Sequence, residues 1–92
     1  MGILFSSILA TISAMTKNIV GLRVRQARRM ANPRITQLDL VARLQLGGLS
    51  IDQSGLSKLE NGQRPVTDIE VAALAKALRV SVAWLLGERD DS

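Results

Sequence analysis

The chain has 92 residues and contains neither cysteine nor histidine. Without cysteine it has no disulfide framework, no thiolate metal site and no cysteine nucleophile. The absence of histidine removes the commonest general base and the commonest metal ligand. Asp and Glu remain as acids and bases, but no paired carboxylates stand in a pattern typical of an active site. We therefore expect a protein that is not an enzyme and that uses no cofactor and no metal.

Aromatic residues are also scarce, with one Phe, one Trp and no Tyr. Alternating runs of β-branched residues, which are typical of strands, are missing, whereas Leu and Ala favour helices. Hydrophobic residues make up 47% of the chain, which is enough for one core, and a chain of this length holds only one. We predict a single all-α domain.

Charge of one sign is concentrated in the middle of the chain. Nine basic and three acidic residues lie between Lys17 and Arg64, a net +6, so the rest of the chain carries −2 within the total of +4. A one-sided positive field suits a polyanion such as nucleic acid, or an anionic membrane surface. A solvated basic surface that serves only solubility explains the charge alone equally well.

The first 15 residues, MGILFSSILATISAM, are apolar. They lack the basic region of a secretory signal and are short for a membrane span. We predict that residues 1–16 form a non-essential N-terminal extension. The alternative is a short amphipathic helix that docks on a partner protein or on a second copy of the chain. Its apolar positions would be Leu4, Phe5, Ile8 and Ile12.

Five short helices are predicted from apolar spacing and from residues that begin or stop a helix. They fall at 19–30, 37–46, 53–60, 67–78 and 82–86. The expected caps are Asn18, Thr36, Ser50 or Asp52, Thr67 and Ser81, and Thr67 with Glu70 has the form of a capping box. The residues expected to face the core are Val20, Val24, Ala27, Leu40, Val41, Leu44, Leu56, Leu59, Val71, Leu74, Ala75 and Leu78. We predict a compact five-helix bundle over residues 17–87, followed by an acidic tail over residues 88–92.

The third predicted helix combines two inward-facing leucines, Leu56 and Leu59, with a polar face. The polar side chains are Gln53, Ser54, Ser57 and Lys58, with Asn61 at the helix exit. Gln and Asn make bidentate contacts with adenine, Ser and Lys bond bases or phosphates, and an α-helix fits the major groove. A polar helix face is also common on any protein surface. From this helix alone, DNA recognition and a simple solvated face carry equal weight.

From Val20 to Gly87 the sequence resembles the Cro/CI-type helix-turn-helix family of bacterial and phage regulators, also called the XRE family. The segment QLDLVARL, from Gln37, matches the start of the second helix of that family. The segment LSKLENG, from Leu56, matches the end of its recognition helix, and LAKALRVSVAWLLG, from Leu74, matches its closing segment. The resemblance implies a lambda-repressor-like DNA-binding domain.

What the resemblance implies about function is specific. The chain would be a sequence-specific DNA-binding transcriptional regulator that reads the major groove of double-stranded DNA with helix 52–61. Repression is favoured over activation. The chain would act in the cytoplasm as a homodimer. The DNA-binding residues would be Thr36, Gln37, Gln53, Ser54, Ser57, Lys58, Asn61 and Arg64. Gln37 would also brace Gln53, and Arg28 would form a structural ion pair with Glu60.

Three features depart from the family pattern, and one of them is the link MANPRI, residues 30–35, which is slightly long. The turn LGGLSI, residues 46–51, is longer than usual, which bears on the angle of the recognition helix. Arg79 occupies a helix end where the family prefers Gly or Asn, so a positive φ is expected to be strained there. Near the end of the chain, Trp84 and Leu85 together with Leu86 either fill the core or contribute to a dimer contact, and the core is the preferred place for Trp84.

Two other functions remain open from the sequence. The chain is alternatively a DNA-binding antitoxin or a protein-interaction adaptor, working through a partner protein. The adaptor would insert its N-terminal apolar segment into that partner. A weaker alternative places the basic surface on an anionic membrane with residues 3–12 inserted. We expect a DNA partner rather than a membrane.

Overall fold

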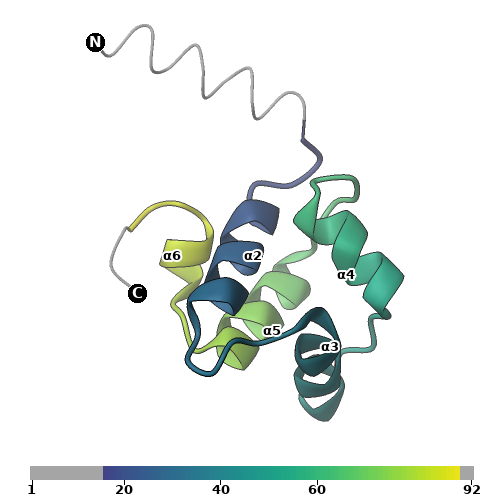
Figure 1. The fold of residues 1–92 in the computed structure, drawn as a ribbon. Helices are drawn as coiled ribbons and strands as arrows, with labels where there is room; N and C mark the ends of the chain where they lie inside the picture. Colours follow the sequence, from purple (N-terminus) through teal and green to yellow (C-terminus); the bar gives the residue numbers. More distant parts are fainter. Residues whose placement is uncertain (1–15, 90–92) are drawn as a thin grey trace, which may run out of the picture.

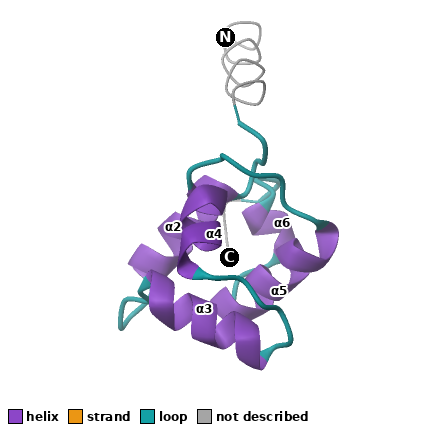
Figure 2. Ribbon diagram, turned by 90° about the vertical axis from the view of Figure 1, so that its right-hand side faces the viewer, coloured by secondary structure: helices purple, strands orange, loops and turns teal. Residues whose placement is uncertain are grey.

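The computed structural model describes residues 16–89, and within that range the chain is helical and has no strand (Figure 1; Figure 2). The helices are α2 (Gly21–Met30), α3 (Gln37–Leu46), α4 (Gln53–Glu60), α5 (Asp68–Leu78) and α6 (Val82–Leu85). The predicted all-α bundle of five helices is therefore confirmed. The apolar segment before residue 16 and the last three residues of the acidic tail lie outside the described residues, and their roles stay predictions.

Each helix from α3 onward begins behind a side chain that accepts a hydrogen bond from the first helical turn. These caps are Thr36, Asp52, Thr67 and Ser81. Thr67 and Glu70 form the predicted capping box, in which each side chain accepts from the backbone amide of the other. Of the two caps expected for α4, Asp52 is the one used, and its Oδ1 accepts from the Gly55 amide at 2.7 Å.

The start of α2 differs from the prediction. The regular helix begins at Gly21 rather than at Ile19, and its formal cap, Val20, makes no side-chain hydrogen bond. Asn18 nevertheless accepts from the amides of Val20 and Gly21, at 3.1 and 2.7 Å. Asn18 thus binds the amides at the start of α2, as expected of a cap, but from a turn that precedes the helix. Its side-chain nitrogen is bound to the distant carbonyls of Leu59 and Arg64.

The core forms where α2 contacts α4, α5 and α6, and α3 closes it by packing against α4 and α5 (Figure 1). All the residues predicted to face inward are buried except Val41 and Val71, which are half-buried against the same core. The spacing of apolar residues therefore predicted the core-facing sides of α2, α3, α4 and α5.

Trp84 and Leu85 of α6 are core residues, exposed by only 4% and 0%. The part in a dimer contact suggested for these two side chains is wrong, because side chains buried within one chain cannot reach a partner. Leu86 is half-buried, and its part in such a contact stays a prediction. The preferred placement of Trp84 in the core is confirmed. The Arg23 guanidinium lies 4.8 Å from the centre of the Trp84 ring, which adds a cation–π contact between α2 and α6.

The residue after α5 adopts a left-handed backbone conformation, as the family comparison of Arg79 predicted. Arg79 has φ 59° and ψ 41°, and it is the one residue other than glycine with positive φ among residues 16–89. A side chain bearing a Cβ costs about 1–2 kcal/mol in this region. The chain accepts this strain because the Arg79 and Val80 amides close the helix on the carbonyls of its last turn.

Candidate nucleic-acid interface

α4 separates an apolar face from a polar face within eight residues. Leu56 and Leu59 are 0% and 1% exposed and hold the helix against α2 and α3. The other side of the helix carries the polar side chains that the sequence predicted. We call this set the α4 surface: exposed Gln53, Ser54 and Lys58, half-buried Ser57, and exposed Asn61 at the helix end. The helix thus presents polar groups outward from a rigid, apolar base.

Glu60, the last residue of α4, is buried and bound by Arg28 of α2. Arg28 Nε and Nη2 donate to the two carboxylate oxygens at 2.6 and 2.8 Å, and Nη1 donates to the Ile35 carbonyl at 3.1 Å. The expected pair of Arg28 and Glu60 is therefore present. Burial raises the pKa of Glu60, but the hydrogen bonds from Arg28 and Gln37 lower it by more, so the carboxylate is charged at neutral pH. This bidentate pair locks the last turn of α4 to α2.

A chain of amide hydrogen bonds runs from this buried pair to the start of α4. Gln37, the first residue of α3, donates from Nε2 to Glu60 Oε1 at 3.1 Å. Its own Oε1 therefore faces away and accepts from Gln53 Nε2 at 3.4 Å. One N–H of the Gln53 amide is used in this bond. The second N–H and the oxygen are the pair of groups that a glutamine uses to bind adenine.

The start of α3 is closed by a second capping box. Thr36 Oγ1 accepts from the Asp39 amide, and Asp39 Oδ2 accepts from the Thr36 amide, both at 3.0 Å. The hydrogen bond from the Thr36 backbone amide to the Asp39 carboxylate, with a smaller contribution from the Thr36 side chain, holds the pKa of Asp39 below its ordinary value. The backbone amide and the hydroxyl of Thr36 are therefore both used in the capping box. The predicted contact of Thr36 with DNA would be made in addition to these two hydrogen bonds.

The segment after α4 is tied to two other helices. Arg25 of α2 donates from Nη2 to Asn61 Oδ1, a bond that does not involve the side-chain nitrogen of Asn61. Arg64 donates from Nη2 to Glu70 Oε2 at 2.8 Å. Burial raises the pKa of Glu70, but the bonds from Arg64 and Thr67 lower it by more. Arg64 is thus half-buried in a structural pair, and its predicted DNA contact stays a prediction.

Gly21 and Arg25 position α4 and were missed by the sequence reasoning. A Cβ on Gly21 would lie 2.3 Å from the Leu59 carbonyl oxygen. Only glycine therefore allows the start of α2 to approach the end of α4 this closely. A glycine inside a helical pattern is itself a signal of such close approach. Arg25 offered no signal, because spacing placed it on the solvent side of its helix.

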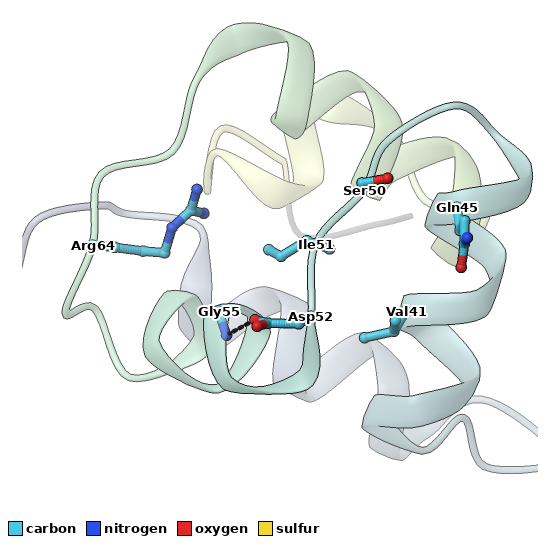
Figure 3. Close-up of a pocket in the computed structure, with 7 residues that line it drawn as sticks. All are labelled: Val41, Gln45, Ser50, Ile51, Asp52, Gly55 and Arg64. Carbon is cyan, nitrogen blue, oxygen red and sulfur yellow. Dashed lines mark hydrogen bonds between the residues drawn. The ribbon is translucent and has the colours of Figure 1, made fainter.

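The long turn between α3 and α4 lines a surface hollow of about 610 Å³ (Figure 3). The residues around it are Val41, Gln45, Ser50, Ile51, Asp52, Gly55 and Arg64. A Cβ on Gly55 would lie 3.0 Å from Asp52 and 3.1 Å from Ile51, so this glycine faces the turn rather than α3. The extra turn residues border the hollow without separating the helix starts, since Gln37 and Gln53 still form a hydrogen bond.

The positive charge of residues 17–64 is divided between the interior and the surface. Arg28 is buried, Arg25 and Arg64 are in ion pairs, and Arg23 lies on Trp84. The exposed cations of this stretch are Lys17, Arg29, Arg34, Arg43 and Lys58. Lys58 belongs to the α4 surface itself, so this polar face also carries positive charge.

The fold and the α4 surface together define a helix-turn-helix protein, in which α3 and α4 are the two helices of the helix-turn-helix motif. A family model described as helix-turn-helix matches residues 24–85, which run from α2 through α6. A search of curated proteins and a search of solved structures gave no match. The chain belongs to the Cro/CI-type helix-turn-helix family, the XRE family, and is a DNA-binding transcription regulator of that type.

Two further observations concern the described residues only. No helix in residues 16–89 is both long enough and apolar enough to cross a membrane. The same residues contain no cluster of Asp and Glu side chains arranged to hold a metal ion. Members of this family are typically not enzymes.

Proposed function

We propose that this regulator is a repressor that binds operator DNA as a homodimer, with the α4 surface in the major groove. The observation that carries the proposal is the bond from Gln53 to Gln37, which holds a base-reading amide at the outer end of α4. A glutamine held in this way spends less side-chain entropy on binding than a free one.

The dimensions and the order of side chains on α4 support this placement. An α-helix is about 10–12 Å across and the major groove is about 12 Å wide. The first residues of a recognition helix are the ones that reach base edges, and here they are Gln53 and Ser54. We assign Ser57 to the bases as well, and Lys58 and Asn61 to the phosphates, which carry most of the affinity.

The homodimer follows from the way such domains read DNA. Two copies related by a two-fold axis contact half-sites roughly 34 Å apart along one face of the duplex. We favour repression because a domain bound over a promoter blocks transcription by occupying it, whereas activation needs a further contact surface. The repressor would act in the cytoplasm, where bacterial DNA lies.

Selection of bound DNA from a randomised pool of duplexes tests this function. We expect the full chain to recover a two-fold symmetric sequence and to bind it with an affinity that falls steeply with salt, by a log–log slope of about −0.9 per phosphate contacted. Lys58→Gln should reduce that slope by about one per bound copy. Lys76→Gln, which removes an exposed lysine of α5 instead, is the matched control and should leave the slope unchanged.

Recovery of no sequence, or binding that does not respond to salt, would exclude the proposal. A selected site without two-fold symmetry would exclude the homodimer but not the DNA-reading helix. Recovery of a site only after a partner protein is added would favour the antitoxin or adaptor alternative.

A further inference from the structure

We propose that Asn18 is a positioning residue for DNA binding, because it ties the exit of α4 to the start of α2. This inference rests on the proposed function and adds a residue outside the helix-turn-helix to it. Asn18 lies before the segment that the family model matches, which begins at residue 24. It is the third of the residues that the structure describes.

The side chain of Asn18 forms hydrogen bonds in two directions. Its Oδ1 accepts from the amides of Val20 and Gly21 at the start of α2, at 3.1 and 2.7 Å. Its Nδ2 donates to the carbonyls of Leu59 and Arg64, at 3.0 and 2.8 Å. A simple helix cap needs only the oxygen. The two bonds from the nitrogen join Leu59, in the last turn of α4, to Arg64, at the end of the segment that follows the helix. We call that segment, residues 61–64, the exit loop.

The residues before Asn18 hold the middle of the same loop. The Lys17 amide donates to the Gly62 carbonyl at 2.9 Å. Thr16 Oγ1 donates to the Asn18 carbonyl at 2.7 Å and lies 3.4 Å from the Gly62 carbonyl oxygen. Gly62 has φ +71°, and a Cβ on it would lie 2.1 Å from Thr16 Oγ1. Thr16, which the sequence placed in the extension, therefore packs directly on the exit loop. Residues 16–18 form a strap across it.

This strap determines where the phosphate-contacting end of the α4 surface lies. The exit loop carries Asn61, which we assign to a phosphate, whereas Gln53 is held at the other end of α4 by Gln37. Loss of the Asn18 nitrogen should therefore displace the phosphate contacts and leave the base-reading end in place. The expected signature is weaker binding to every duplex by a similar factor, with sequence discrimination retained.

Asn18→Ser tests this with the full chain. Serine keeps an oxygen that accepts from the α2 amides but has no nitrogen to reach the exit loop. The probes are the duplex that the wild-type chain selects from a randomised pool and a duplex of the same length with scrambled sequence. At a temperature where circular dichroism shows every variant folded, we expect about tenfold weaker binding to both duplexes, the loss typical of two hydrogen bonds.

Two controls separate positioning from stability. Ser81→Ala removes the cap of α6, whose Oγ accepts from the Trp84 amide at 3.0 Å, and should lower the melting temperature without changing affinity for either duplex. Amide hydrogen exchange in the absence of DNA supplies a second readout. The Gly62 and Gln63 amides, which close the end of α4, should exchange faster in Asn18→Ser but not in Ser81→Ala.

The outcomes are distinguishable. Asn18→Ser that binds both duplexes as tightly as wild type, with unchanged exchange at Gly62 and Gln63, would overturn the inference while leaving the proposed function intact. A wild-type chain that binds neither duplex would overturn both. If Asn18→Ser does not fold, Thr16→Val removes the hydroxyl of the strap, which bonds the Asn18 backbone and the Gly62 carbonyl, and should weaken binding about two- to threefold. Unchanged binding by that folded variant would count against the strap.

Discussion

Replacing Glu60 with Gln tests whether the buried ion pair holds α4 in place. The change keeps the size of the side chain but removes the charge that faces Arg28. Loss of one partner from a buried pair costs about 3–5 kcal/mol. We expect the lower end, about 3 kcal/mol at pH 7, because the Ile35 carbonyl and the remaining oxygen of Gln still accept hydrogen bonds from Arg28. For a domain of this size the melting temperature should fall by about 12–24 °C.

The pH dependence of this loss is the sharper test. The pKa of Glu60 is lowered in the folded chain, so the stabilisation by the pair is complete above the ordinary glutamate pKa of about 4.3 and disappears as the pH falls through the lowered value. Gln does not titrate. The difference in free energy of unfolding between wild type and Glu60→Gln should therefore narrow as the pH is lowered below about 4.3.

Urea unfolding at a series of pH values measures this difference directly. The other carboxylates with lowered pKa values, Asp39 and Glu70, titrate in both proteins, so their contributions cancel. Glu88→Gln, which alters an exposed glutamate after α6, is the control and should match wild type at every pH. A difference between wild type and Glu60→Gln that stays constant from neutral to acidic pH would refute the ion-pair account.

Three further substitutions are predicted to change the melting temperature. Arg79→Gly should raise the free energy of unfolding by about 0.5–1 kcal/mol, because relief of the left-handed strain exceeds the added entropy of the unfolded chain; a lower melting temperature would contradict this. Gly21→Ala should lower the free energy of unfolding by about 1–3 kcal/mol, since the new methyl group meets the Leu59 carbonyl. An unchanged free energy of unfolding would show that α2 shifts away from α4 at no cost. Thr67→Ala should lower the free energy of unfolding by about 1 kcal/mol, because it removes the capping box of α5. An unchanged free energy of unfolding in urea would show that the capping box does not stabilise the domain.

Most of the fold could be predicted from the sequence because its signals are local. Apolar spacing located the buried sides of the four longer helices, and a capping residue stood before α3, α4, α5 and α6. The start of α2 was predicted too early because Asn18 looks like an ordinary cap. Its two bonds to residues more than forty positions away have no local signal.

The candidate site was predictable in its composition but not in its connections. The polar face of α4 follows from the helical period, and the Gln37–Gln53 contact was expected from the family resemblance. The contact of Arg25 with Asn61 and the pair of Arg64 with Glu70 depend on how separate helices pack. Net charge likewise gave no indication of which arginines would be used inside the domain.

The central claim is that the polar face of α4 reads base pairs, and Gln53→Ala tests it most directly. The measurement compares the affinity of wild type and Gln53→Ala for the selected duplex and for single base-pair variants of it at fixed salt. We predict that the variant loses about 1–3 kcal/mol of discrimination at one position in each half-site while its melting temperature stays unchanged. Identical discrimination by the two proteins at every position would contradict the account.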